Sequence, residues 1–370
     1  MSDAFVGANL KSTNDGLKWA KAGPDVIPAW VADMDLPTAP AVIEALHRRA
    51  GGDLGYPSWL EQPTGGPLAE AFAGRMAARY GWSPDPALVR PFSDINQALQ
   101  VLLHVWTEPG DTVAVHTPAY HPFLGTLESM RRPLRPIQAR PDGDSWRFEV
   151  PDLAGCKVLL LVNPHNPTGR VFTREELAEL AELAERHDLM VIADEIHADL
   201  VYGPERHIPF ATILPARTVT LTSATKAFNL GGIRCSVAHV SAPGVLKALD
   251  AQPPFLFGSP SVLGVEATVA AWLHGDAWLD ETRALLDRNR RAIAARLPEE
   301  VTYRIPQATY LAWLDYGRTG MAEVLEEKAK VLLSDGAAFG PGGETYVRLN
   351  FATTEPVLDE LLRRIATTEL

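Results

Sequence analysis

Lys226 is the residue whose surroundings most clearly indicate chemistry. It lies three residues after Ser223 and eight before Arg234, in a stretch of small residues and glycines. A lysine amine can form a Schiff base with an aldehyde, while a hydroxyl and a guanidinium can bind a phosphate. Residues 218–222 predict a buried strand just before this stretch. Lys226 is therefore expected where α/β sheets place their ligands, beyond the carboxyl end of a strand.

The middle of the chain alternates short apolar runs with helix-like stretches. Residues 112–116, 158–162 and 189–193 are short apolar runs that predict buried strands, and 158–162 is too uniformly apolar for a strand that faces water on one side. Between the last two runs, Thr173 and Glu176 form a capping box that opens a helix. Buried strands that alternate with helices predict βαβ units and a mostly parallel sheet in an α/β protein.

The C-terminal third has a different pattern, which predicts a smaller α+β domain. A long helical pattern covers residues 278–297 and leads to a predicted strand at 310–314. A second helix is expected around 321–332, followed by a strand at 346–351. A closing helix is expected from Pro356 onward.

The Lys226 segment resembles the Schiff-base lysine segment of fold-type I pyridoxal 5′-phosphate (PLP) enzymes, the aminotransferase class I/II superfamily. The likeness covers essentially the whole chain. It implies a large PLP-binding domain of residues 45–275. It also implies a small domain of residues 1–44 and 276–370, so that the large domain is inserted between two parts of the small one. Lys226 would hold the cofactor covalently and serve as the general base.

The resemblance also gives roles to residues that follow the apolar runs. Asp194 would keep the pyridine nitrogen of PLP protonated, whereas an isolated aspartate there would most simply cap a helix. Asn166 would donate to the 3′-oxygen and Tyr120 would stack on the ring; the alternatives are an ordinary turn and a core tyrosine. His197 stands where many aminotransferases carry a tyrosine near the 3′-oxygen, and a structural histidine fits equally well.

The cofactor phosphate would be bound at two places. Ser223 and Arg234 would contact it from one side. The backbone amides of Ile95 and Asn96, at the start of a helix, would contact it from the other. Asp94 stands where the family usually carries a glycine. A carboxylate beside a phosphate is unfavourable unless it points away.

Two more residues match the family outside these segments. Tyr56, in Gly-Tyr-Pro, matches a tyrosine that family members lend across a dimer to the partner's phosphate, which implies a homodimer with shared active sites. Arg348, in Val-Arg-Leu-Asn-Phe, matches the arginine that binds the substrate α-carboxylate. The alternative for Arg348 is an edge-strand arginine that pairs with a surface acid.

The segment 30–36, Trp-Val-Ala-Asp-Met-Asp-Leu, is similar to the MalY/PatB-type cystathionine β-lyases, which are C–S lyases. Aminotransferases generally carry a glycine-rich loop here. Leu36 replaces the usual aromatic residue. The resemblance implies cleavage of an S-substituted L-cysteine, such as cystathionine, to a thiol, pyruvate and ammonia. Further similar segments are 17–19, 194–200, 308–315 and 348–351.

Two other functions remain open at this point. One is an aminotransferase, or a related oxidative or decarboxylative PLP enzyme, acting on an amino acid or a cysteine conjugate. The other is a PLP-binding regulatory module that works with transcription machinery. The net charge of −12 and the lack of a helix-turn-helix pattern before Trp30 disfavour that module. The intact set of Lys226, Asp194 and Arg348 disfavours it as well.

Composition limits the size of the core and the partners and cellular location that are expected. The chain has 370 residues, of which 46% are hydrophobic, so it can bury one large core and a smaller second one. The net charge and the lack of a long basic run argue against nucleic acid or a membrane surface as a partner. Cys156 and Cys235 are too few for a disulfide framework, and no metal is expected. Residues 1–5 lack a leader pattern, so a cytoplasmic protein is expected. The family resemblance implies a small-molecule amino-acid substrate.

Overall fold

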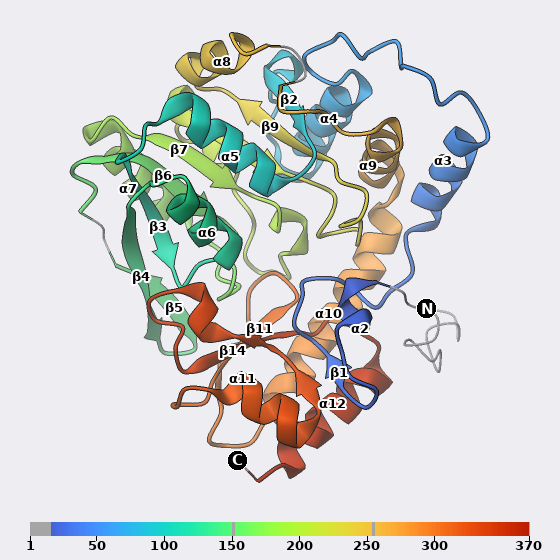
Figure 1. Ribbon diagram of the computed structural model, residues 1–370, viewed down its shortest axis with the longest axis vertical. Coiled ribbons are helices and arrows are strands. Elements are labelled where there is room, and N and C mark those ends of the chain that lie inside the picture. The colour runs from blue at the N-terminus through green and yellow to red at the C-terminus, as the bar shows by residue number, and fades with distance from the viewer. Residues whose placement is uncertain (1–15, 150–151, 254–255, 370) are drawn as a thin grey trace.

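The larger part of the protein is built on one eight-stranded sheet (Figure 1). The computed structural model describes residues 16–149, 152–253 and 256–369. The four pairings between β8 and β4 are parallel, and the three pairings at the two ends of the sheet are antiparallel. The strands lie in the order β2 (Val89–Phe92), β9 (Ser236–Val240), β8 (Thr218–Thr222), β7 (Met190–Asp194), β6 (Cys156–Val162), β3 (Thr112–Thr117), β4 (Leu134–Asp142) and β5 (Ser145–Phe148).

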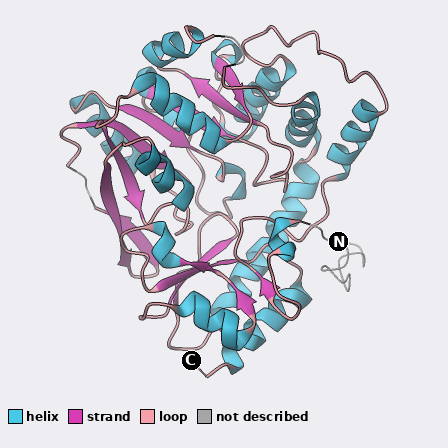
Figure 2. Cartoon of the chain, in the orientation of Figure 1, coloured by secondary structure: helices cyan, strands magenta, loops and turns pink. Residues whose placement is uncertain are grey.

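Helices cover both faces of this sheet, as its uniformly apolar strands require (Figure 2). Helices α5 (Ile95–Trp106), α6 (His121–Ser129) and α8 (Pro243–Asp250) share a core with Leu160 of β6. Helix α7 (Arg174–Arg186) shares another core with Leu159 and Leu161. Because neighbouring strand residues point to opposite faces, these two cores lie on opposite sides of the sheet.

A third core joins most of the other helices to the smaller part of the protein. It includes buried residues from the small four-stranded antiparallel sheet, such as Leu311 and Leu349. That sheet has the order β10 (Thr302–Tyr303), β11 (Leu311–Asp315), β14 (Tyr346–Asn350) and β13 (Ser334–Asp335). The helices outside the first two cores are α2 (Leu17–Ala20), α3 (Pro40–Ala50), α4 (Pro67–Tyr80), α9 (Val262–His274), α10 (Asp276–Arg296), α11 (Met321–Val324) and α12 (Glu355–Thr367).

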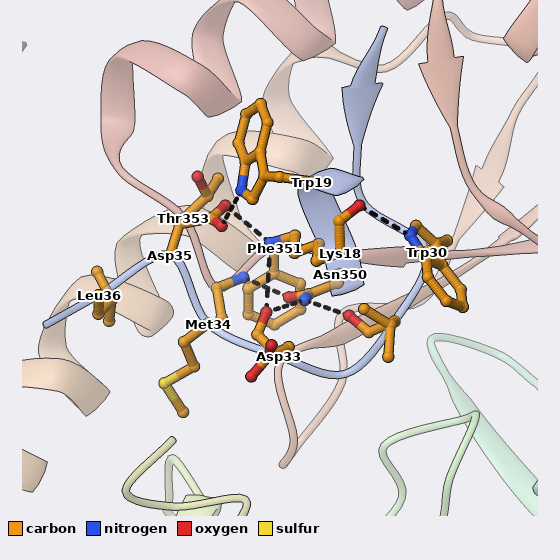
Figure 3. A network of polar contacts seen from close by, with 12 residues as sticks. Lys18, Trp19, Trp30, Asp33, Met34, Asp35, Leu36, Asn350, Phe351 and Thr353 are labelled. Atoms are coloured by element: carbon orange, nitrogen blue, oxygen red, sulfur yellow. Dashed lines mark hydrogen bonds and ion pairs between the residues drawn. The ribbon is translucent and has the colours of Figure 1, made fainter. Parts of the chain in front are cut away.

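The N-terminal segment is fixed to the small sheet by buried polar contacts (Figure 3). Lys18 Nζ lies 2.7 Å from Asp35 Oδ2, and both side chains are almost fully buried. Trp19 Nε1 donates to the other oxygen of Asp35 at 2.7 Å. The backbone amide of Asp35 donates to the carbonyl of Ala352 at 2.8 Å, just after β14. Strand β1 (Ile27–Pro28) adds a parallel pairing with β12 (Val331–Leu332).

The predicted mostly parallel sheet and its capped helix are confirmed. Thr173 and Glu176 form the expected reciprocal bonds at the start of α7. The predicted helix around 321–332 is wrong only at its C-terminal end, because helical structure stops at Ala329. Helix α11 ends at Val324, a π-helical turn follows, and Lys330 takes a positive φ of 56°. Tertiary pairing overrides helical propensity here, because Val331 and Leu332 join β1 instead.

The expectations about a leader segment and about a metal site concern a chain of which the structure describes only part. Residues 1–5, which carry the prediction about a leader, lie outside the described residues. In the described part of the chain, no helix is long and apolar enough to cross a membrane. The same residues contain no cluster of three or more side chains able to hold a metal ion.

Candidate active site

One cavity collects nine of the eleven residues singled out from the sequence. It lies beyond the carboxyl ends of β6, β7 and β8, where the sequence places ligands in an α/β sheet. Arg348 lies next to the cavity and Tyr56 lies outside it. The nine lining residues are Ile95, Asn96, Tyr120, Asn166, Asp194, His197, Ser223, Lys226 and Arg234.

Lys226 follows β8 and enters the cavity with its amine held by a backbone carbonyl. Its Nζ donates to the carbonyl oxygen of Ala32 at 2.8 Å. Burial, reinforced by the positive charge of Arg348, lowers the pKa of Lys226 to about 8, although Asp33 and Asp194 oppose the shift. A substantial fraction of this amine is therefore neutral near neutral pH, which a nucleophile and a general base both need.

Asp194 is the last residue of β7 and is buried in the floor of the cavity. Burial raises its pKa to about 7, and one hydrogen bond from the Ile196 amide, at 3.1 Å, opposes this shift. A cation placed against this carboxylate would stabilise its ionised form. Asp194 is therefore suited to pair with a protonated ring nitrogen.

Asn166 belongs to a rigid turn after β6. The turn is tied to the neighbouring strand because the Asn163 amide donates to the Asp194 carbonyl at 3.0 Å. Inside the turn, His165 Nδ1 lies 2.8 Å from Thr168 Oγ1. Asn166 is buried, and its Oδ1 accepts from Arg348 at 3.2 Å. The Asn166 side chain thus links the cavity to the arginine beside it.

Two rings complete this part of the cavity. Tyr120 caps the start of α6, and burial raises the pKa of its hydroxyl. His197 is buried, and among the described residues no partner binds its Nδ1. Burial, together with the charges of Lys226 and Arg348, lowers the pKa of His197 to about 3. His197 is therefore neutral at physiological pH and can act only as a neutral donor or acceptor.

The predicted phosphate contacts lie together at the other side of the cavity. Ser223 is buried, accepts from the Thr225 amide at 3.1 Å and donates to the Cys235 carbonyl at 2.6 Å. Arg234 has a largely exposed side chain and forms an ion pair with Asp94. The Asp94 carboxylate does not point away from this site. It faces Arg234, the arginine predicted to bind the phosphate.

Arg348 is a buried cation in β14 without an acidic partner among the described residues. Its guanidinium donates to the Trp30 carbonyl at 3.1 Å and to Asn166, and its Nε has no partner in that part of the chain. Burial lowers its pKa to about 10. The alternative of an arginine paired with a surface acid is wrong, since the side chain is 2% exposed.

Asp33 and Asp35 lie in one turn, but their carboxylates have different surroundings. Asp35 is enclosed by Lys18 and Trp19, whereas the Asp33 side chain is turned away from that pair (Figure 3). The backbone carbonyl of Asp33 accepts from Lys18 Nζ at 3.2 Å and from Asn350 Nδ2 at 2.6 Å. Burial raises the pKa of the Asp33 carboxyl, and the charges of Lys18 and Lys226 oppose this shift.

Sequence reasoning missed several groups that shape the cavity. Phe123 and Thr225 line it, three residues after Tyr120 and one residue before Lys226. Their position next to Tyr120 and Lys226 was the available signal. The carbonyl groups of Trp30 and Ala32 hold Arg348 and Lys226. No residue type marks a backbone carbonyl, so no sequence pattern could have identified these two acceptors.

Comparisons with known proteins agree with this arrangement. Residues 31–365 match the family described as Aminotransferase class I and II. The chain belongs to this family. Its fold class was therefore predicted correctly from the sequence.

Similar proteins within this family include carbon–sulfur lyases. A cystathionine β-lyase of Corynebacterium glutamicum is 36% identical, with 95% of each chain covered. Cystathionine β-lyase PatB of Bacillus subtilis is 33% identical, over 94% of this chain and 95% of that protein. The structure of a PLP-bound C–S lyase from Staphylococcus hominis has a TM-score of 0.88 at 28% identity, with 98% and 97% of the chains covered. The predicted resemblance to cystathionine β-lyases is thus confirmed.

Proposed function

We propose that this protein is a PLP-dependent C–S β-lyase that cleaves an S-substituted L-cysteine to a thiol, pyruvate and ammonia. The proposal rests on sequence similarity and site geometry taken together. The chain is similar over nearly its full length to cystathionine β-lyases. Its cavity holds a lysine of lowered pKa, and beside the cavity lies a buried arginine that has no acidic partner among the described residues. PLP, when bound, supplies an electron sink for the bonds broken at the substrate Cα and Cβ.

The residues of the cavity fit this cofactor. Asp194 offers a carboxylate to a ring nitrogen, and Tyr120 offers an aromatic ring from a neighbouring element. Asn166 keeps its amide nitrogen free of any partner within the described residues, so it can donate to a ring oxygen. Arg234 and the start of α5 offer donors for a phosphate. Ser223 lines the same side, and its one hydroxyl proton is donated to the Cys235 carbonyl, so it would have to turn to bind a phosphate. We assign the cofactor to these groups.

Arg348 would hold the substrate through its α-carboxylate. A buried guanidinium with an unused Nε–H favours an anion, and a carboxylate can accept two parallel hydrogen bonds from it. Asn166 and the Trp30 carbonyl orient the guanidinium. This arrangement would fix the substrate Cα relative to Lys226, which improves the geometry for proton transfer.

Lys226 would remove the proton from Cα. Its neutral amine accepts the proton, and the Ala32 carbonyl, 2.8 Å from Nζ, would accept a hydrogen bond from the resulting ammonium. The electron pair released at Cα can then form a double bond to Cβ while the sulfur leaves as a thiolate. In a transamination the C–S bond would stay intact, so the fate of this electron pair separates the two reactions.

The assembly and the domain limits are further proposals. We infer a homodimer in which Tyr56 reaches the partner's phosphate site. Its side chain is 91% exposed and does not reach the cavity of its own chain. We also propose a large domain of residues 45–275 and a small domain of residues 1–44 and 276–370. Residues 1–15 of the small domain lie outside the described part of the chain.

The direct test is a product analysis. The purified protein, with PLP and either L-cystathionine or S-methyl-L-cysteine, should release thiol, pyruvate and ammonia in equal amounts. Lys226→Ala, assayed alongside, should release none. Formation of the 2-oxo acid of the intact substrate, with its C–S bond unbroken, would contradict the proposed reaction and indicate an aminotransferase.

A further inference from the structure

The start of helix α5 carries a carboxylate where the phosphate donors meet. Asp94 is the N-cap of α5, and its Oδ1 accepts from the Gln97 amide at 2.9 Å. Its Oδ2 accepts from the Arg234 guanidinium and lies 3.3 Å from Ser93 Oγ. Asp94, Arg234 and Ser93 all line the cavity that holds Lys226. Asp94 is therefore part of the proposed phosphate subsite and not of the surrounding surface.

The other groups at this place favour an anion. Ile95 and Asn96 are the first two residues of the twelve-residue helix α5, and no acceptor within the described residues binds their backbone amides. The positive end of the helix dipole adds to their effect. Arg234 contributes a full positive charge, but its guanidinium is already paired with the Asp94 carboxylate. A phosphate bound here and the Asp94 carboxylate would draw on the same guanidinium.

We propose that Asp94 is an internal competitor of the cofactor phosphate and lowers the affinity of this enzyme for PLP. The competition has two sources, which are the shared Arg234 and the repulsion between a carboxylate and a phosphate dianion. Both act on the phosphate alone. The inference rests on the proposed cofactor and is independent of the reaction that the enzyme catalyses.

Asp94→Asn isolates this effect. Asparagine is as good an N-cap as aspartate, so the helix start is kept while the negative charge is removed. Asp94→Ser, which also caps, is a second variant if the first folds poorly. Asp85→Asn is the matched control, because Asp85 caps a short helix by accepting from the Ala87 amide but does not line the cavity.

The experiment compares two ligands that differ only in the phosphate. Holoenzyme is stripped of cofactor with hydroxylamine, and dissociation constants for PLP and for pyridoxal are measured by absorbance. Asp94→Asn should bind PLP about tenfold more tightly, with pyridoxal affinity unchanged, and Asp85→Asn should change neither. Adding Arg234→Ala should reduce the gain from Asp94→Asn, because the shared partner is gone.

Three results would overturn the inference. Weaker PLP binding by Asp94→Asn would mean that Asp94 holds Arg234 in position for the phosphate. Equal gains for PLP and pyridoxal would mean a general effect on the cavity, and unchanged affinities would mean that the carboxylate does not compete. If the wild-type protein binds neither ligand, the proposed cofactor itself is wrong, which is a separate failure.

Discussion

At the scale of single residues, burial decides which protonation states the cavity offers. It lowers the pKa of Lys226 to about 8 and of His197 to about 3, and it raises that of Asp194 to about 7. Each shift penalises the charged form of the group. The result is a reactive lysine, a neutral histidine and a carboxylate that is readily stabilised by a nearby cation.

The lowered pKa of Lys226 makes a kinetic prediction. Cofactor-free protein is mixed with pyridoxal at a series of pH values, reduced with borohydride, and the adduct on Lys226 is measured by peptide mapping. The rate should rise with pH and level off above about 8, because only the neutral amine attacks the aldehyde. At pH 7 about a tenth of this amine is neutral, against about one in three thousand for an ordinary lysine. A rate still rising at pH 10, or an adduct on another lysine, would contradict the assignment.

Arg348 makes a prediction about substrate binding. Arg348→Ala should weaken binding of every α-amino acid substrate by roughly 2–4 kcal/mol, because a buried carboxylate would lose its charged partner. Binding of the amine that lacks the carboxylate should change much less. Arg348→Lys is the matched control, since it keeps the charge and loses the two-point contact. Dissociation constants that rise equally for acid and amine would point to a structural role for Arg348.

Sequence reasoning located most of the site because the reactive side chains follow recognisable strands. Lys226 and Asn166 lie just after buried strands, and Asp194 ends one. It could not predict the Asp94–Arg234 ion pair. These residues are 140 positions apart, and only the folded sheet brings them together.

At the scale of elements, the N-terminal segment depends on a buried ion pair. Lys18 and Asp35 are 2% and 1% exposed and lie on two sides of β1 in the sequence. Asp35 also binds Trp19 and, through its amide, Ala352. The pair therefore fixes the turn that contains Asp33 and the Ala32 carbonyl against the small sheet. Patterns of single elements do not reveal such a contact, just as they did not reveal the β1–β12 pairing that replaced a predicted helix.

Removing one member of this pair should be costly. Lys18→Met leaves Asp35 as an uncompensated buried charge, and the free energy of unfolding should fall by roughly 3–5 kcal/mol. Arg288→Ala is the control, because Arg288 and Glu355 form an ion pair whose side chains are 54% and 59% exposed. That variant should lose at most about 1 kcal/mol. Urea unfolding of both variants measures the difference, and equal losses would show that burial of the Lys18 pair adds nothing.

At the scale of the whole molecule, the described chain does not complete the proposed site. Tyr56 is exposed and lies away from the cavity, although the family resemblance places such a tyrosine at a phosphate. A second copy of the chain would resolve this difference. The family resemblance and the exposure of Tyr56 suggest this arrangement. How two copies pack depends on the shape of their surfaces, which the strand and helix patterns of a sequence do not predict.

The dimer proposal can be tested with Tyr56→Phe. The variant should stay folded and dimeric, and its PLP dissociation constant should rise by roughly ten- to a hundredfold, as expected for one lost hydrogen bond to a charged group. Sedimentation velocity and cofactor titration measure these two properties. A wild-type protein that is monomeric and fully active at assay concentration would refute shared active sites.

The most direct test of the account counts turnovers in the absence of any 2-oxo acid. Elimination leaves the cofactor in its aldehyde form, whereas transamination converts it to the amine form and needs an acceptor to continue. With L-cystathionine alone, the protein should form pyruvate far in excess of the number of active sites, at a rate that an added 2-oxo acid does not change. Reaction that stops after one equivalent, and resumes when a 2-oxo acid is added, would show that this protein is an aminotransferase.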